Sequence, residues 1–294
     1  MLLMIFSNSY AQYFPQQYEN FSVSFGVHAT DPVHIKTEER NLPQQSIQVR
    51  FRATNATYYP FLLKVDFIQF ENLVPRPTPR EEQIMHGTTL LYTFSQQAPN
   101  AGYGYNYRYT YKLKPSLEKI DAEYPYLIPL KEGKMVNSRK RHNQRYMNSF
   151  TCNEGDTIYC MRKGFVTACP ETKTPDFRIS SNDCLEVLHD DGTIMIYMNL
   201  GQTNAFATPG KNVYPGQPIG IVSDSSYLQV SLLKISNGEG NKTIFIPQPL
   251  KLTVGKDRLF TYNEIDGSGV SVFPEDIITK EMNPKEIRQA KARK

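Results

Sequence analysis

Histidines and acidic side chains are the residues from which this chain could build a hydrolytic metal centre. Five histidines are present: His28, His34, His86, His142 and His189. A catalytic zinc site takes three protein ligands and leaves a further position open for water. The second half of the chain contains only His142 and His189, so it is poor in the imidazoles that such a site uses. The histidine distribution therefore argues against an ordinary zinc hydrolase.

Cysteines are the other chemically distinctive group, and all four lie within 33 residues: Cys152, Cys160, Cys169 and Cys184. No Cys-x-x-Cys pair occurs, and spacings of 8, 9 and 15 match no common structural zinc site. In an exported protein disulfides are permitted, and four cysteines allow three pairings. If residues 165–169 and 185–190 are neighbouring strands, Cys169 and Cys184 lie at the two ends of their connection, which favours that bridge. The alternative is that the thiols are small buried core residues.

Other catalytic patterns are missing from the sequence. There is no Gly-x-Ser-x-Gly elbow, phosphate-binding loop or dinucleotide-binding fingerprint. Cysteine catalysis would require a thiolate beside a base, and Cys152 lies near His142 only along the chain.

Composition bounds the size and the partners of the protein. With 294 residues, 39% hydrophobic and 12% aromatic, the chain is long enough for two packed domains. The formal net charge is +4, and residues 285–294 alone hold five Lys or Arg and one Glu. The rest of the chain is therefore neutral overall, which disfavours a nucleic-acid-binding surface.

The first eleven residues are uncharged, mostly apolar at the start, and end in a Ser-x-Ala pattern that suits cleavage by a signal peptidase. Residues 1–11 are therefore predicted to be a signal peptide, the start of which is truncated because no basic residue precedes the apolar run. The alternative is a buried first strand. No later segment has the roughly 20 apolar residues of a membrane-spanning helix. We expect an exported protein of the periplasm or cell envelope, or a secreted one.

Alternating apolar and polar residues dominate after position 12 and predict an all-β protein. Residues 12–123 are expected to form a β-sandwich of immunoglobulin-like size. A second β domain follows over 124–272, and a basic helical tail closes the chain over 273–294. A solvated tail is the expectation there, with attraction to an anionic envelope surface as the alternative.

Two local patterns stand out within these domains. Five tyrosines recur at every second position and so share one face of a strand: Tyr103, Tyr105, Tyr107, Tyr109 and Tyr111. A packed sheet face is the favoured interpretation, and a platform for sugars or a partner protein is the alternative. In the second half, two alternating runs flank the pair Asp191-Gly192, which predicts a tight hairpin over 185–200.

The second half resembles the M23 peptidase family, the lysostaphin-like zinc endopeptidases built on the duplicated hybrid motif. The resemblance extends over about 130 residues, from 124 to 253, and is carried by residues 130–133, 155–166, 185–200 and 209–220. In the last stretch the family has a Val followed by Gly-Gln-x-Ile-Gly, and this chain reproduces it with Val213, Gly216, Gln217, Ile219 and Gly220.

The residues that hold zinc in the family are replaced here. The resemblance puts Ser149 at the Asp ligand and Arg145 at the first His ligand, or His142 in the longer-spaced variant of that motif. It puts Asn199 at the His of a Tyr-x-His-Leu strand and Gln229 at the second His of a His-Leu-His. The groove of the degenerate site is therefore expected to be lined by His142, Arg145, Ser149, Tyr197, Asn199, Tyr227 and Gln229. Asn and Gln oxygens are poor substitutes for imidazole on zinc, and an arginine repels the ion.

The resemblance thus implies a retained scaffold without catalytic residues or cofactor, which binds peptidoglycan or an envelope protein and regulates cell-wall hydrolysis. The family includes degenerate members that activate cell-wall amidases. One alternative is an M23 zinc metalloendopeptidase acting on peptidoglycan cross-link peptides, with zinc held by His142 and by Asp183, His189 or Asp190. Another is a structural envelope protein in which the tyrosine stripe makes the contacts.

Overall fold

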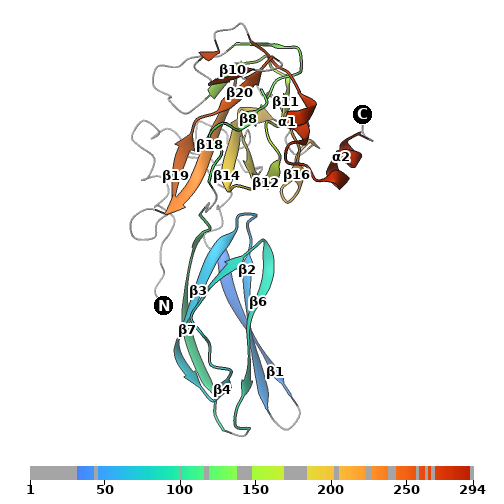
Figure 1. Ribbon diagram of the computed structural model, residues 1–294. Coiled ribbons are helices and arrows are strands. Elements are labelled where there is room, and N and C mark those ends of the chain that lie inside the picture. Colours follow the sequence, from blue (N-terminus) through green and yellow to red (C-terminus); the bar gives the residue numbers. More distant parts are fainter. Residues whose placement is uncertain are drawn as a thin grey trace. The chain divides into compact units, whose positions relative to one another are not determined.

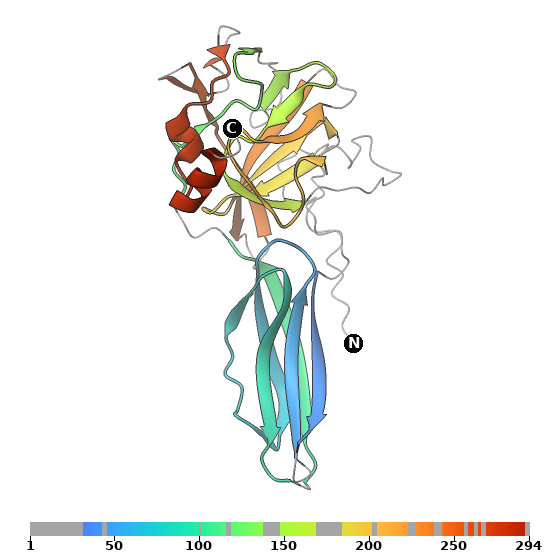
Figure 2. The same cartoon turned by 90° about the vertical axis from the view of Figure 1, so that its right-hand side faces the viewer.

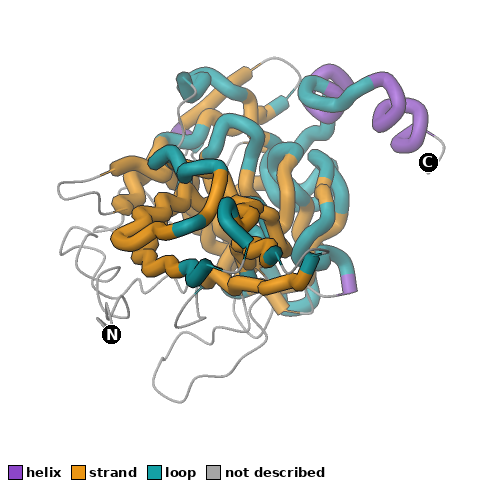
Figure 3. The backbone as a smooth tube through the Cα atoms, turned by 90° about the horizontal axis from the view of Figure 1, so that it is seen from below, coloured by secondary structure: helices purple, strands orange, loops and turns teal. Residues whose placement is uncertain are grey.

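The computed structural model describes residues 32–42, 46–99, 101–115, 119–137, 148–168, 184–201, 205–222, 227–237, 243–255, 258–261, 264–265 and 269–291. They fall into two compact units: the first holds the described residues up to Lys114 together with Asn237 and Thr243, and the second holds the other described residues from Pro115 onward. Within the described stretches the only α-helices are the short α1 (Glu275–Thr279) and α2 (Pro284–Lys291), and strands predominate (Figure 3). The predicted all-β fold is confirmed. The signal peptide predicted at 1–11 lies outside these residues.

None of the helices in the described stretches is both long and apolar enough to cross a membrane.

The first unit consists of two antiparallel sheets (Figure 1). One has the strand order β1 (Val33–Asn41), β2 (Ile47–Asn55), β6 (Gly87–Gln96), β4 (Leu73–Val74). The other has the order β5 (Glu81–Ile84), β3 (Phe61–Glu71), β7 (Gly104–Leu113). Strand alternation explains the packing, since Val49, Phe51 and Ala53 of β2 are fully buried while the residues between them are not.

Aromatic rings join the two sheets of this unit. Phe51 of β2 packs edge to face against Phe67 of β3 and against Tyr105 and Tyr107 of β7, with all three centroid distances at 5.2 Å. Edge-to-face pairs are a favoured geometry because the positive ring edge meets the negative ring face. Burial raises the pKa of Tyr105 and Tyr107. These two tyrosines therefore belong to a packed sheet face, as the favoured interpretation of the stripe predicts.

The second unit is built on a large sheet that contains the long strand β18 (Tyr227–Asn237) (Figures 1 and 2). The strand order is β10 (Asn148–Thr151), β18, β14 (Thr193–Met198), β13 (Cys184–Leu188), β12 (Gly164–Ala168), β16 (Asn212–Val213), and β19 (Thr243–Gln248) also pairs with β18.

Smaller sheets complete this unit. One contains β11 (Thr157–Tyr159), β17 (Pro218–Val222) and β15 (Leu200–Gly201). The others contain β21 (Arg258–Thr261), β20 (Lys251–Val254) and β8 (Pro125–Tyr126), and the pair β22 (Gly269–Val270) and β9 (Met135–Val136).

The core of the second unit lies against one face of its large sheet. Phe150, Val230, Tyr197 and Leu185, from four neighbouring strands, are all fully buried in one hydrophobic cluster. Because side chains alternate along a strand, the residues next to them in sequence point to the opposite face. That opposite face carries Ser149 and Gln229, two of the positions singled out by the resemblance.

The predicted hairpin is confirmed. β13 and β14 pair antiparallel around a connection in which the amide of His189 donates to the carbonyl of Thr193 at 2.8 Å. Gly192 has a φ of +78°, the left-handed conformation that a glycine adopts without steric cost. β12 and β13 are also neighbours, as expected for the strands that precede Cys169 and follow Cys184.

The C-terminal segment is anchored to the second unit rather than freely solvated. Ile277 of α1 is 8% exposed. Lys163 donates to the carbonyl of Glu281 at 2.9 Å and to the carboxylate of Glu286 at 3.0 Å, and the Tyr214 hydroxyl donates to Glu286 at 3.0 Å. The expectation of a solvated tail is wrong for this part of the segment, because two of its acidic residues meet cations and hydroxyls of the domain.

Candidate functional site

Four strands of the large sheet place a row of side chains on the face away from the core. Ser149 of β10 is opposite Gln229 of β18, Gln229 is opposite Met198 of β14, and Met198 is opposite Cys184 of β13. Residues directly opposite in neighbouring strands share a face and lie within contact distance of each other. The row therefore brings together positions that are up to 80 residues apart in the chain.

Ser149 and Gln229 form the contact at one end of this row. The Gln229 Nε2 amide donates to the Ser149 hydroxyl at 3.4 Å. Ser149 is 1% exposed and Gln229 is 7% exposed. The resemblance assigns these residues to two zinc-ligand positions taken from separate motifs, and the sheet register makes them direct cross-strand partners. Both are too covered to line an open groove by themselves.

Asn199 and Tyr227 lie beside this contact. Asn199 follows β14 and has a φ of +63°, a left-handed conformation that asparagine tolerates better than most residues. The Asn199 side-chain amide donates to the carbonyl of Tyr227 at 3.3 Å, and Tyr227 is opposite Thr151 in the β10–β18 ladder. Both residues are partly exposed. They are the described residues of the candidate site that a ligand could reach.

Tyr197 does not belong to this site, so its predicted role in lining the groove is wrong. Its side chain is fully buried in the core, on the opposite face of β14. Its hydroxyl accepts a hydrogen bond from the amide of Met161 at 2.9 Å. Burial raises the pKa of Tyr197 well above its usual value. The prediction failed because side chains alternate along a strand. Met198 points to the face of the site, and its neighbour Tyr197 points to the core.

Three other predicted residues, His142, Arg145 and Cys169, lie outside the described residues, so the proposed Cys169–Cys184 disulfide stays a prediction. Cys152 and Cys160 are buried and donate to backbone carbonyls at 3.4 and 2.9 Å. Burial raises the pKa of Cys152 to about 11 and that of Cys160 to about 12. Neither is poised to be a thiolate nucleophile.

The described side chains of the site do not fit a zinc ion. Gln229 and Asn199 use their amide N–H groups as donors, to Ser149 and to the carbonyl of Tyr227. A hydroxyl and two amides are weak ligands for an ion that prefers imidazole, thiolate and carboxylate. Nowhere in the described stretches do three or more His, Cys, Asp or Glu side chains gather as a metal site.

His189 lies at the far end of the hairpin from this site. It follows β13 beyond the Leu188–Ile194 pair, whereas the site is beside the Cys184–Met198 pair. His189 is five residues beyond Cys184 along the chain, which corresponds to roughly 17 Å at the usual rise of a strand. His189 is also 2% exposed, and its Nδ1 pairs with the Thr193 hydroxyl at 2.9 Å. A structural role at the turn accounts for these contacts.

Sequence reasoning did not single out a buried cluster around Arg162. The guanidinium donates to Asp191 at 2.7 Å and to Glu281 at 2.6 Å, and it lies 4.0 Å from the ring centroid of Tyr124. Its side chain is 5% exposed. Glu281 is 119 residues away from Arg162, so no local pattern indicates the contact. The only signal is the Arg-Lys pair at 162–163, which stands between the apolar residues 160–161 and β12.

Comparisons with known proteins add limited information. No protein-family model matches the chain. No curated protein matches it either.

Among solved structures, the catalytic domain of lysostaphin from Staphylococcus simulans is matched at 18% identity and a TM-score of 0.28, over 38% of this chain and 86% of that one. The deep-sea M23 metalloprotease pseudoalterin is matched at 12% identity and a TM-score of 0.31, over 47% of this chain and 95% of that one. Csd3 from Helicobacter pylori is matched at 10% identity and a TM-score of 0.30, over 84% of this chain and 54% of that one. TM-scores this low do not establish a shared fold.

Proposed function

We propose that the second unit is an M23-type scaffold that binds peptidoglycan or a protein partner in the cell envelope without hydrolysing it. The observation that supports this proposal is the convergence of Ser149, Asn199, Tyr227 and Gln229. Three separate sequence motifs placed these residues, with Tyr227 and Gln229 coming from the same one, and the ladder and two hydrogen bonds bring all four together. Convergence of separate motifs is what a retained active-site framework requires.

The chemistry of the side chains favours binding over catalysis. Ser149 and Gln229 are paired with each other and covered, so neither presents a metal ligand or a free nucleophile. Tyr227 offers an aromatic face and Asn199 an amide, which are suited to stacking and hydrogen bonding with a peptide or glycan. A regulatory role in cell-wall hydrolysis is the function that this proposal implies.

Zinc analysis of the purified full chain separates this proposal from a divergent zinc endopeptidase. We expect substoichiometric zinc and no cleavage of peptidoglycan cross-link peptides. Stoichiometric zinc that is lost in His142→Ala, together with such cleavage, would establish the enzyme instead.

Restoring the family's ligands tests the framework itself. We expect the variant Arg145→His/Ser149→Asp/Gln229→His to bind one zinc ion per chain, because the side chains of cross-strand partners lie close enough to coordinate the same ion. The matched control is Arg145→His/Ser149→Asp/Ser231→His, which moves the last histidine one row along the same face of β18 to a residue opposite Ile196. Equal zinc contents in the two variants would contradict the proposed placement of the active-site positions.

Binding is tested by co-sedimentation of the full chain with purified peptidoglycan. We expect the wild type to sediment and Tyr227→Ala to lose most of that binding. The control Tyr103→Ala removes a tyrosine from the first unit. If Tyr103→Ala rather than Tyr227→Ala abolished binding, the contact would be assigned to the first unit.

A further inference from the structure

A small cavity in the first unit lies under the segment that passes from one sheet to the other. Residues 75–80 connect β4 of the first sheet to β5 of the second and include three prolines at alternate positions. Proline has no amide N–H, so such a segment makes few ladder hydrogen bonds and crosses the side of the sheets instead. The cavity has a volume of about 190 Å³ and is lined by Val65, Phe67, Phe70, Arg76, Pro77 and Pro79.

A β-bulge builds the aromatic side of this cavity. The register of β3 against β7 shifts between Phe67 and Gln69, which turns Ile68 outward, where it is 65% exposed. Because of the extra residue, Phe67 and Phe70 contact each other at 5.4 Å although they are three positions apart. Both rings also meet Phe94, at 5.5 and 4.7 Å, so they are held by the core behind them.

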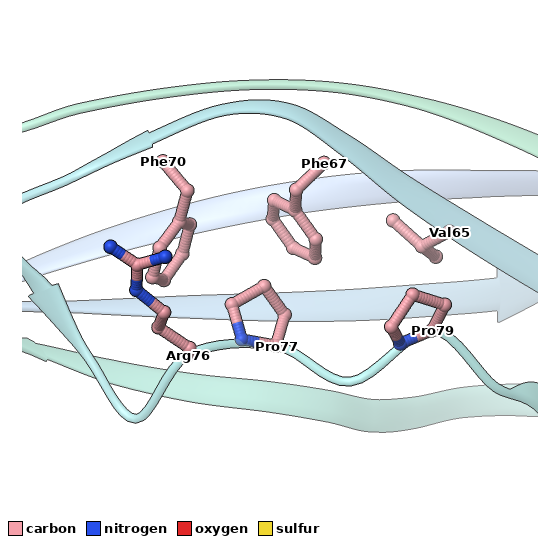
Figure 4. A pocket seen from close by; sticks show the side chains of 6 residues that line it. All are labelled: Val65, Phe67, Phe70, Arg76, Pro77 and Pro79. Atoms are coloured by element: carbon pink, nitrogen blue, oxygen red, sulfur yellow. The ribbon is translucent and has the colours of Figure 1, made fainter.

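The opposite side of the cavity is formed by proline rings and one cation. Figure 4 shows Phe70, Phe67 and Val65 on the strand side, facing Arg76, Pro77 and Pro79 on the connecting segment, with Arg76 at the Phe70 end. Phe67 and Phe70 both keep part of their surface exposed. The cavity therefore has an apolar interior and a positive charge at one end.

Arg76 differs from the next arginine on the same segment. Arg80 forms an ion pair with Glu82 and lies 5.9 Å from the ring centroid of Tyr92. Arg76 is exposed and makes no ion pair within the described part of the chain. A guanidinium without an internal partner is suited to bind a carboxylate in a bidentate manner.

We propose that this cavity binds the C-terminal aromatic residue of a peptide, with the ring between Phe67, Phe70 and Pro77 and the free α-carboxylate on Arg76. The volume is sufficient for one ring, since an apolar protein cavity of about 150 Å³ holds benzene. Rings that approach Phe67 and Phe70 can take the edge-to-face geometry that these residues already make with Phe94. Charge complementarity selects an anionic chain end over an amidated one.

Three small probes test both parts of the site on the full chain by saturation-transfer NMR titration. N-acetylphenylalanine has the ring and the carboxylate, its amide has only the ring, and N-acetylalanine has only the carboxylate. We expect N-acetylphenylalanine to bind best and the amide to bind about five-fold more weakly, the size of effect expected from one exposed ion pair. N-acetylalanine should show no saturable binding.

Variants then locate the binding. Arg76→Gln should give N-acetylphenylalanine and its amide equal affinity, whereas the control Arg80→Gln should keep the preference for the acid. Phe70→Leu, a mild change in a partly buried ring, should weaken both aromatic probes equally. The proposal is overturned if the wild type does not discriminate acid from amide, if Arg76→Gln keeps that discrimination, or if no aromatic probe binds.

Discussion

The Arg162 guanidinium donates to the Glu281 carboxylate through Nη2 at 2.6 Å and through Nε at 3.1 Å. Glu281 lies between α1 and α2, so this ion pair links that segment to the Arg162 guanidinium, which is buried beside the β13–β14 hairpin. Asp191 of the hairpin shares the same guanidinium at 2.7 Å. The C-terminal segment is thus held by a buried, branched ion pair rather than by apolar contacts alone.

Glu281→Gln should destabilise the second unit by about 1.5–3 kcal/mol, the usual loss when a hydrogen bond to a buried charged group is weakened. Denaturant unfolding of the full chain measures this loss, and limited proteolysis should show earlier cleavage within residues 275–291. The control is Asp276→Asn, which removes an exposed carboxylate from the same segment. Equal stability of the two variants would show that the ion pair does not anchor the segment.

His189 should remain neutral in the folded protein well below neutral pH. Burial and the nearby positive charge of Arg162 lower its pKa from 6.5 to about 3. Since Asp191 accepts from the Thr193 hydroxyl at 2.7 Å, that hydroxyl is left to accept from Nδ1–H of His189. Nitrogen NMR of the imidazole should therefore show the Nδ1–H tautomer down to about pH 4.

The same shift makes stability depend on pH. The unfolded chain binds a proton at His189 below pH 6.5, whereas the folded chain does not until about pH 3. The unfolding free energy should therefore be unaffected by this group above pH 6.5 and fall as the pH drops below it, by up to about 1.4 kcal/mol per pH unit. His189→Gln should reduce this slope, and His34→Gln, which changes an exposed residue, should not.

Gly164→Ala should cost more stability than Gly220→Ala. A Cβ at Gly164 would lie 2.4 Å from Val187 Cγ1 and 2.8 Å from the carbonyl oxygen of Leu188, and backbone cannot move aside easily. A Cβ at Gly220 would meet only the side chain of Leu200, at 2.7 Å. We expect a loss of about 1–3 kcal/mol for Gly164→Ala, in the range of overpacked sites.

Thermal unfolding compares these two glycine variants with Gly102→Ala, where a new Cβ has no neighbour within 4 Å. If Gly164→Ala is as stable as Gly102→Ala, β12 and β13 do not pack as closely as described.

Asn199→Gly should leave stability within about 0.5 kcal/mol of the wild type, whereas Asn199→Val should lose about 1–2 kcal/mol. The φ of +63° is open to glycine and strained for a β-branched residue. Chemical denaturation measures both effects. Equal losses in the two variants would indicate that the Asn199 hydrogen bond to Tyr227, rather than the backbone conformation, sets the requirement at this position.

The parts of the structure that depend on local pattern could be predicted from sequence. Alternation gave the strands, and the Asp191-Gly192 pair gave the hairpin, because turn geometry is decided by a few adjacent residues. The resemblance to a family put Ser149 and Gln229 in one groove, but their direct pairing was not predicted, since register between distant strands is not encoded locally. Tyr197 was misplaced because one residue of offset reverses the face on which a side chain lies.

Contacts between buried polar groups could not be predicted from the sequence, for a different reason. Arg162 and Glu281 are ordinary surface residues by type, and only the folded chain shows that the Arg162 side chain is 5% exposed. A desolvated ion pair depends on the complete surroundings of both partners and not on any spacing between them.

The pairing of β18 with both β10 and β14 also determines when the site can form during synthesis. β10 and β14 are both made before β18, yet each pairs with it and not with the other. A growing chain that has passed Ser149 must therefore add another 80 residues before Gln229 exists to meet it. Such long-range pairing makes folding slow and leaves strand edges unpaired in the meantime. A product that stops before Tyr227 would lack the strand that joins β10 to β14, so the chain must be made through β18 before the site can assemble.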